Sequence, residues 1–201
     1  NGVKAIFTDD GIIRELAAGK RSFSSANSIN WGRLVPQIVY YFYGYLDLCR
    51  RGAVKPGAPF NIAVPTGNFG NILAGYFAKE MGLPIARMIC ASNSNNVLTD
   101  FINTGIYDRN RPFYTTISPS MDILISSNLE RLLFYLSGND AERVTEWMRD
   151  LKTKGCYRVD QDTATQIKNL FYGGFADEAS TMETIQRVYQ ETRYVMDPHT
   201  A

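Results

Sequence analysis

Apolar residues in the middle of the chain follow a strand pattern, then a helix pattern, then a strand pattern again. Residues 60–64 and 85–91 are short apolar runs that predict buried strands. Between them, small and apolar residues recur at helical spacing after Gly70, and Gly82 with Pro84 predicts the end of this helix. Strand, helix and strand over about thirty residues make a parallel βαβ unit. The pattern therefore predicts the α/β class, with a mostly parallel sheet and flanking helices.

Apolar positions at helical spacing, often with Asn or Asp before them and Gly after them, predict the other helices. These helices are expected within residues 34–49, 97–102, 128–138, 141–154, 160–174 and 178–194. Residues 113–117 predict one further strand. Because the expected strands all precede residue 138, we divide the chain into an α/β segment, residues 1–137, and a mostly helical continuation, residues 138–201.

A turn with two glycines joins the first strand to its helix over the residues Val64 to Asn71, which read Val-Pro-Thr-Gly-Asn-Phe-Gly-Asn. A helix that begins directly after such a turn presents free main-chain N–H groups at the positive end of its dipole, where proteins commonly bind phosphate. We therefore expect a phosphate here. The alternative is an ordinary turn, in which the glycines supply positive φ angles and Asn68 and Asn71 cap the helix. The spacing matches neither the dinucleotide fingerprint nor the P-loop, so both interpretations stay open.

A cluster of hydrogen-bonding residues lies just before the long helix expected at residues 34–49. The cluster consists of Asn27, Ser28, Asn30 and Arg33. Considered singly, each residue is best interpreted as part of a helix cap or as an exposed arginine. Considered together, the amide and hydroxyl groups can bind an oxyanion, and Arg33 can hold a phosphate or carboxylate through two N–H groups.

Five polar residues, 92–96, follow the second strand at the edge of the sheet where ligands of α/β proteins bind. We favour the simpler interpretation, in which most of them cap the helix over residues 97–102. Asp122 ends the turn Ser-Pro-Ser-Met-Asp at residues 118–122, and we interpret it as a turn-forming residue.

Composition and charge narrow the function classes. Of the 201 residues, 45% are hydrophobic and 20% are charged, which is a normal globular composition. The formal net charge of +1, with both signs mixed along the chain, gives no basic face for nucleic acid, so we expect a small-molecule partner. No apolar run reaches the roughly 18 residues of a membrane span. We therefore expect no membrane partner and a soluble, cytoplasmic protein.

The residues that commonly bind metals are sparse. Cys49, Cys90 and Cys156 are far apart and form no C-x-x-C motif, which indicates reduced structural cysteines. His199 is the single histidine, so this chain alone cannot form a multi-histidine metal centre. We expect no metal site. The chain begins at Asn1 without methionine, and we expect it to be a piece of a longer protein.

Four segments occur in an order and at separations that resemble those of threonine synthase. They are Asn27-Ser-Ile-Asn-Trp-Gly-Arg33, Val64-Pro-Thr-Gly-Asn-Phe-Gly-Asn71, Ser118-Pro-Ser-Met-Asp122 and Asp197-Pro-His-Thr-Ala201. The similarity covers essentially the whole chain, and the combination is far more specific than any one segment. It implies a pyridoxal-phosphate enzyme of fold-type II, the tryptophan-synthase-β type, that converts O-phospho-L-homoserine and water to L-threonine and phosphate. The chain would be an internal, partial domain of that enzyme.

The resemblance also implies roles for individual residues. The cofactor phosphate of pyridoxal 5'-phosphate would be bound by the main chain of Gly67, Asn68, Phe69, Gly70 and Asn71. The substrate phosphate would be contacted by Asn27, Ser28, Asn30 and Arg33. Such charged and polar donors can stabilise the phosphate as it departs as the leaving group.

The Schiff-base lysine of the family lies in a Phe-Lys-Asp segment, which this chain does not contain. Among the seven lysines, the nearest match is Lys79 in Phe-Ala-Lys-Glu, which we interpret as a solvated residue in mid-helix. We therefore expect no catalytic residue in this chain and no turnover from it alone.

Two alternative functions stay open. One is a related fold-type II pyridoxal-phosphate enzyme, a dehydratase or sulfhydrylase, although the residues from Asn27 to Arg33 argue against it because such substrates need not carry a phosphate. The other is a non-catalytic domain that binds a phosphate-containing ligand or has a regulatory role. A partial parallel sheet also exposes apolar edges, which favours self-association.

Overall fold

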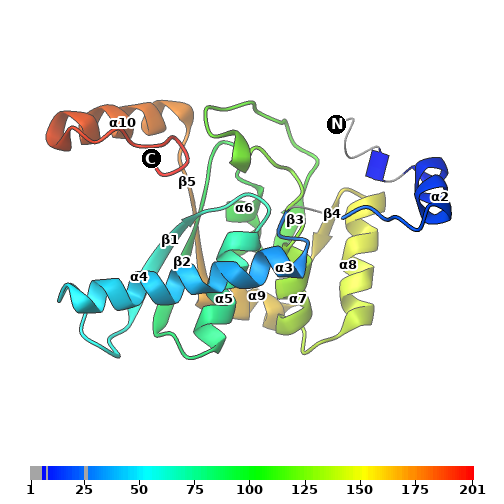
Figure 1. Cartoon of the computed structure of the whole chain (residues 1–201), viewed down its shortest axis with the longest axis horizontal. Coiled ribbons are helices and arrows are strands. Elements are labelled where there is room, and N and C mark those ends of the chain that lie inside the picture. The colour runs from blue at the N-terminus through cyan, green and yellow to red at the C-terminus, as the bar shows by residue number, and fades with distance from the viewer. Residues whose placement is uncertain (1–5, 8, 25–26) are drawn as a thin grey trace.

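The structure is a computed structural model that describes residues 6–7, 9–24 and 27–201. Its main sheet has three parallel strands in the order β1-β2-β5, namely β1 (Phe60–Pro65), β2 (Ile85–Ser92) and β5 (Phe171–Phe175). Helix α5 (Gly70–Glu80) connects β1 to β2 and completes the βαβ unit (Figure 1). The expected α/β fold, with a parallel sheet and flanking helices, is confirmed.

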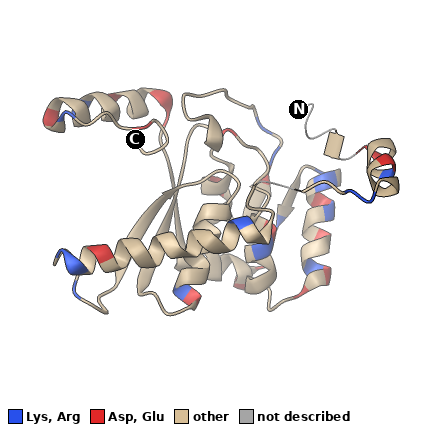
Figure 2. Ribbon diagram, in the orientation of Figure 1, with Lys and Arg blue, Asp and Glu red and all other residues tan. Residues whose placement is uncertain are grey.

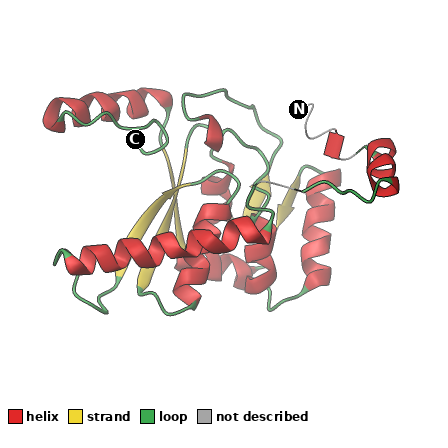
Figure 3. Ribbon diagram, in the orientation of Figure 1, coloured by secondary structure: helices red, strands yellow, loops and turns green. Residues whose placement is uncertain are grey.

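The other helices with described bounds lie around the sheet or farther out, and α2 lies well apart from the sheet, beyond α8 (Figure 3). They are α2 (Asp10–Ala18), α3 (Trp31–Leu34), α4 (Ile38–Arg50), α6 (Val97–Thr104), α7 (Leu129–Leu136), α8 (Ala141–Thr153), α9 (Gln161–Leu170) and α10 (Glu178–Thr192), with short 3₁₀ turns at η1 (Val35–Gln37) and η2 (Pro119–Met121). Two short strands, β3 (Ile106–Asp108) and β4 (Cys156–Arg158), pair antiparallel in a separate small sheet. The sequence pattern predicted neither of them.

Residues 171–175 form strand β5, and the prediction that the helix continues to residue 174 is wrong. Helix α9 ends at Leu170 because Phe171 is buried in the main sheet, where it pairs with Met88. Gly173 packs against α6, where a Cβ atom would lie only 2.9 Å from Thr99 Cα. The glycine that we interpreted as a helix stop is therefore the residue that lets a strand approach a helix closely. The part of the chain after residue 138 supplies one strand of the main sheet in addition to its helices.

Residues 113–117 form no strand, so this prediction is also wrong. Three of their main-chain N–H groups, those of Tyr114, Thr116 and Ile117, donate to side chains instead of to a neighbouring strand. The Tyr114 N–H donates to Asn95 Oδ1, and the Thr116 N–H donates to Asp122 Oδ2, both at 2.9 Å. Because these side chains satisfy the main chain, the segment needs no strand partner.

Helices cover one face of the main sheet. The buried residues Val64 and Cys90 are paired across β1 and β2, and they lie on the same face as Gly173 of β5, which packs against α6. On the opposite face, Arg87 and Tyr172 are exposed. A parallel sheet is usually covered on both faces. Here the face that packs against α6 is the more completely covered of the two.

Charged residues of both signs occur on α8 and on α10, and the sheet carries few of them in the view of Figure 2. This distribution agrees with the formal net charge of +1. In the part of the chain that the structure describes, no helix is long and apolar enough to cross a membrane.

Cys90 lies in the core, and we expect its thiol to resist modification. It is 0% exposed, and burial raises the pKa of its thiol to about 12, although a hydrogen bond with Thr66 opposes the shift. Because the thiolate is the reactive form, a disulfide reagent at pH 8 should modify the half-buried Cys49 and Cys156 at least about 100-fold faster than Cys90. Counting the thiols modified before and after unfolding in urea tests this. Equal rates for all three cysteines in the folded protein would contradict it.

Candidate phosphate site at the glycine turn

The turn between β1 and α5 has an unusual main-chain conformation at Phe69. Its φ angle is +63°, in the left-handed region, which a bulky residue adopts only when its surroundings impose it. The Phe69 side chain is 1% exposed, and its ring lies 5.7 Å from the ring of Phe171 on β5. Burial of this ring therefore holds the turn in a conformation that would otherwise be unfavourable.

The two glycines of the turn are required by close contacts. A Cβ atom on Gly67 would lie 2.3 Å from the carbonyl oxygen of Ser120, and a Cβ atom on Gly70 would lie 2.3 Å from Ser28 Cβ. Neither glycine has a positive φ angle. The interpretation in which the glycines supply positive φ is therefore wrong, because Phe69 is the residue in that conformation and the glycines make room for two other segments.

The carbonyl oxygens of the turn are bound by protein donors. Ser126 Oγ donates to the Gly67 carbonyl at 2.8 Å. The Asn68 carbonyl accepts from the main-chain N–H of Asn128 at 3.1 Å and from its Nδ2 at 2.9 Å. By contrast, the main-chain N–H groups of residues 67–71 donate to no acceptor among the described residues. Free N–H groups at a helix N-terminus are suited to an anion.

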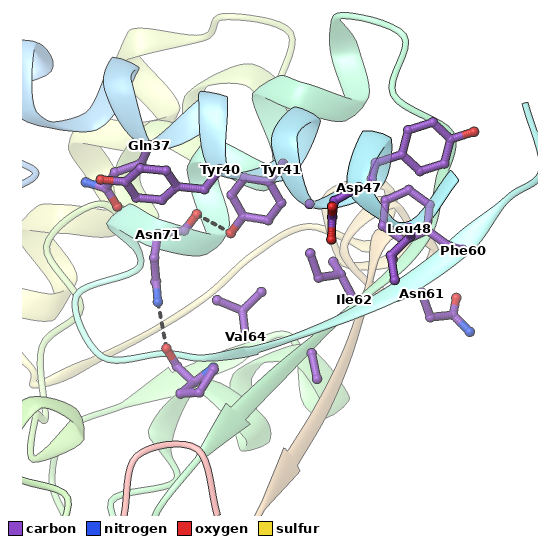
Figure 4. Close-up of a pocket in the computed structure, with 14 residues that line it drawn as sticks. Gln37, Tyr40, Tyr41, Asp47, Leu48, Phe60, Asn61, Ile62, Val64 and Asn71 are labelled. Carbon is purple, nitrogen blue, oxygen red and sulfur yellow. Dashed lines mark hydrogen bonds between the residues drawn. The ribbon is translucent and has the colours of Figure 1, made fainter. Parts of the chain in front are cut away.

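Asn71 ties the turn to its neighbours. Its Nδ2 donates to the Pro65 carbonyl at 2.6 Å, and its own carbonyl accepts from the hydroxyl of Tyr41 on α4 at 2.6 Å (Figure 4). Asn71 Oδ1 also accepts from the main-chain N–H of Ile72 at 2.9 Å. Among the residues that the structure describes, this is the only bond we find of the capping expected from Asn68 and Asn71. Burial raises the pKa of Tyr41, so its hydroxyl stays a donor.

A cavity of about 300 Å³ opens in front of the turn. It is lined by Ser28, Gln37, Pro65, Gly67, Asn68, Gly70, Asn71, Ser120, Met121 and His199. These residues come from all four segments that the sequence analysis singled out, together with Gln37 from η1. The fold therefore brings segments that are far apart in the chain to one cavity.

A second cavity of about 340 Å³ shares Pro65, Met121 and His199 with the first and extends to the carboxyl ends of β2 and β5. Ser92, at the end of β2, lines it. The Ser92 side chain is 6% exposed, and its Oγ has no hydrogen-bond partner among the described residues. A buried hydroxyl without a partner costs free energy, so this atom is a candidate contact for a ligand.

A further cavity of about 520 Å³ lies between α4 and β1 and is a different kind of site. Tyrosine and aliphatic side chains line most of it, as Figure 4 shows for Tyr40, Tyr41, Ile62 and Val64. Of the segment from Val64 to Asn71, it is lined by Val64, Pro65 and Asn71 but not by residues 66–70. Because the cavity of about 520 Å³ is not lined by Gly67, Asn68 or Gly70, the cavity of about 300 Å³ in front of the turn is the better candidate for binding phosphate.

The four residues predicted to contact a substrate phosphate have different surroundings. Ser28 lines the cavity in front of the turn, and its Oγ accepts from Gln37 Nε2 at 2.8 Å. Asn27 Oδ1 accepts from the Ile29 N–H, and Asn30 Oδ1 accepts from the Gly32 N–H, both at 2.9 Å. Asn30 thus caps α3, as the simpler interpretation of the sequence proposed, whereas the bond of Asn27 closes a turn before that helix.

Arg33 is exposed, and its guanidinium forms no hydrogen bond or ion pair with any residue that the structure describes. The segment that carries it is held from another helix: Arg131 on α7 donates from Nη1 to the Ser28 carbonyl at 2.9 Å. Gln37 and Arg131 were both missed by the sequence analysis, because nothing in their local pattern distinguishes them from ordinary surface residues of a helix.

The polar residues after β2 form a buried network. Asp122 Oδ1 accepts from Asn93 Nδ2 at 2.8 Å, from Asn95 Nδ2 at 3.0 Å and from Thr116 Oγ1 at 2.7 Å. Asn96 directly precedes α6, but its side chain forms no capping bond. The interpretation of residues 92–96 as caps is therefore wrong for Asn93 and Asn95. Asp122 does more than form a turn, because it joins the loop after β2 to the loop that contacts Gly67.

Lys79 lies near the end of α5, at the opposite end of the helix from the glycine turn. It is half-buried, and its Nζ donates to the Ile85 carbonyl. The interpretation as a solvated residue in mid-helix is therefore wrong, but its position away from the cavity agrees with a structural role. Among the described residues, no group of His, Cys, Asp and Glu side chains could hold a metal ion.

Comparison with known proteins gives a consistent result over the whole chain. No protein-family model matches it. The chain is 44% identical to threonine synthase-like 1 of Homo sapiens over 201 residues, which cover 99% of this chain and 27% of that protein. It is 41% identical to the threonine synthase of Saccharomyces cerevisiae over 212 residues, covering 99% of this chain and 40% of that protein.

Solved structures agree with the sequence comparison. The structure of pyridoxal-phosphate-bound threonine synthase from Brucella melitensis matches 98% of this chain, with a TM-score of 0.86 and 42% sequence identity. The match covers 40% of that chain. The yeast enzyme matches with a TM-score of 0.86 and 39% identity, over 98% of this chain and 40% of its own. The fold is thus that of the fold-type II enzymes, and the chain spans 27–40% of the length of these relatives.

Proposed function

We propose that this chain, a homologue of threonine synthases over its whole length, is part of an enzyme that converts O-phospho-L-homoserine and water to L-threonine and phosphate. The observation that carries the proposal is the cavity in front of the glycine turn. Four segments that resemble those of the family line it together, although they are spread from Ser28 to His199. An accidental similarity of short motifs would not bring them to one place in the fold.

Pyridoxal 5'-phosphate is the cofactor that fits this site. The N–H groups of residues 67–71 have no acceptor among the residues that the structure describes. Gly67 and Gly70 let Ser120 and Ser28 approach the turn closely, and these residues line the same cavity. We assign the cofactor phosphate to the main chain of Gly67, Asn68, Phe69, Gly70 and Asn71. The unpartnered Ser92 Oγ supplies a further polar contact in the adjacent cavity. When bound, the cofactor supplies an electron sink for the reaction.

We assign the substrate phosphate to the segment that contains Asn27, Ser28, Asn30 and Arg33. The position of Ser28 on the cavity wall supports this assignment, as does the exposed Arg33 guanidinium, which has no partner among the described residues. A guanidinium can bind two phosphate oxygens at once and stabilise the charge as the phosphate leaves. Arg131 supports the segment by binding its main-chain carbonyl at Ser28.

The catalytic lysine is proposed to lie outside this chain. Lys79 supports this view because it is at the wrong end of α5 and bonds to the Ile85 carbonyl. In this proposal residues 1–137 and 138–201 form the cofactor-binding segment and its continuation. They share the main sheet through β5. We also propose a cytoplasmic location, a small-molecule substrate and a tendency of the isolated segment to associate through its open sheet edge.

The decisive experiment uses the protein in its natural length. We expect it to bind pyridoxal 5'-phosphate, seen as visible absorbance, and to release phosphate from O-phospho-L-homoserine. Replacing Arg33 by alanine should lower phosphate release by about 100-fold or more and leave the cofactor absorbance unchanged. Arg187→Ala, at an exposed position on α10, is the matched control and should change neither.

Two outcomes would count against the proposal. If the protein binds no cofactor, the assignment of the glycine turn fails together with the enzyme. If it binds cofactor but does not act on phosphohomoserine, a related enzyme with another substrate or a non-catalytic phosphate-binding domain becomes the better interpretation. Equal losses in Arg33→Ala and Arg187→Ala would remove the specific role of Arg33.

A further inference from the structure

His199 uses both of its ring nitrogens within the protein. Asp197 Oδ1 lies 2.9 Å from His199 Nδ1 and also accepts from the His199 main-chain N–H at 2.8 Å. These two hydrogen bonds lower the pKa of the Asp197 carboxyl group, and the bond from the main-chain N–H has the larger effect. The carboxylate is therefore charged and can only accept hydrogen bonds. The ring is therefore held with its proton on Nδ1, which leaves a lone pair on Nε2.

The lone pair on Nε2 meets a main-chain donor from another segment. The Ser120 N–H donates to His199 Nε2 at 3.1 Å. The His199 side chain is 28% exposed and lies in the wall between the two cavities, since it lines both. The contact thus joins the segment at residues 197–201 to the 3₁₀ turn η2.

The other side of Ser120 faces the glycine turn. Its carbonyl oxygen is so close to Gly67 that a Cβ atom there would lie 2.3 Å from it. A continuous series of contacts thus leads from Asp197 through His199 and Ser120 to Gly67. We propose that neutral His199 is a positioning residue that holds the Ser120 carbonyl against Gly67 and so fixes the N–H groups of the glycine turn toward the cavity. Only the identity of the ligand, pyridoxal 5'-phosphate, rests on the proposed function.

Protonation of His199 removes the acceptor on which this contact depends. A proton on Nε2 would face the Ser120 N–H, donor against donor, and the hydrogen bond would be lost. The nearby carboxylates cannot replace the lone pair. Asp197 is bound at Nδ1, Asp122 is engaged by Asn93, Asn95 and Thr116, and Glu178 on α10 accepts from the Ile117 N–H at 2.6 Å. Protonation of His199 by acid is therefore expected to loosen the position of η2.

Two variants separate positioning from simple packing. In His199→Gln, the side-chain carbonyl can accept the Ser120 N–H but does not titrate, whereas His199→Leu offers no acceptor. We first measure amide hydrogen exchange over residues 118–121 in the protein of natural length without cofactor. We expect His199→Leu to exchange about tenfold faster than the unsubstituted protein at neutral pH, and His199→Gln to exchange at nearly the unsubstituted rate.

The second measurement is the affinity for pyridoxal 5'-phosphate between about pH 5.5 and 8. The unsubstituted protein should lose about tenfold in affinity on acidification beyond the loss shown by His199→Gln. The ionisation of the cofactor itself is common to both proteins, so the comparison isolates His199. His199→Leu should bind weakly at every pH.

Two results would overturn the inference. One is an amide exchange rate in His199→Leu equal to that of the unsubstituted protein. The other is a loss of cofactor affinity on acidification that is the same in His199→Gln and in the unsubstituted protein. If His199→Leu does not fold, the inference is tested by comparing how cofactor affinity changes on acidification in His199→Gln and in the unsubstituted protein. A failure of the proposed function has a different signature, because no variant would then bind the cofactor while the exchange rates would still report the contact at Ser120.

Discussion

Replacing Phe69 by alanine is expected to destabilise the protein by about 3–5 kcal/mol. The ring is 1% exposed and packs against Phe171, so its removal leaves a cavity between the glycine turn and β5. The lost contacts are also those that hold the turn at a φ angle of +63°. The free energy of unfolding, measured by urea titration of the protein in its natural length, tests the value.

A matched pair of variants isolates the conformational part of this effect. Phe69→Gly removes the same contacts, but glycine adopts the left-handed region without the cost of roughly 1 kcal/mol that alanine carries there. Phe69→Gly should therefore be at least as stable as Phe69→Ala, although glycine ordinarily loses more entropy on folding. If Phe69→Gly is clearly the less stable of the two, the turn does not keep this conformation in solution.

The second large effect is expected at Gly67. In Gly67→Ala, the new Cβ atom would meet the Ser120 carbonyl oxygen at 2.3 Å, and because this is a main-chain atom, one of the two segments must move. We expect a loss of about 1–3 kcal/mol in unfolding free energy. We also expect cofactor affinity to fall by more than tenfold, because the movement displaces the N–H groups of the turn.

Gly44→Ala is the control for this substitution. Gly44 lies within α4, and a Cβ atom there would meet nothing within 4 Å. Alanine at an unobstructed helix position stabilises by up to about 1 kcal/mol, so this variant should move stability in the opposite direction. Cofactor affinity should change in Gly67→Ala only. Equal stability of both variants would show that the contact with Ser120 is looser than its geometry indicates.

The local part of the fold could be predicted from the sequence. The βαβ unit around Gly70 follows from two apolar runs and one helical repeat, and these elements stabilise one another within about thirty residues. The candidate phosphate site at Gly67 to Asn71 could be proposed for the same reason, since a helix N-terminus is a local feature. What the glycines do there could not be predicted, because their close neighbours, Ser28 and Ser120, are distant in the sequence.

Elements that depend on distant partners were assigned incorrectly. Strand β5 has the composition of a helix end, and only pairing with β2 makes it a strand. Asn93 and Asn95 look like caps until the fold brings Asp122 to them from the next loop. Likewise, His199 is an isolated histidine in the sequence, and its role depends on where Ser120 lies. In each case tertiary contacts, which no local pattern records, decided the outcome.

The cavity in front of the glycine turn is built from segments at both ends of the chain and from its middle. Contacts between residues far apart in sequence form late in folding, because the intervening chain must first be ordered. The helix α5 and its two strands can form before Ser28, Ser120 and His199 reach the turn. A ligand bound in this cavity would therefore stabilise only the finished structure, and would slow unfolding without speeding folding.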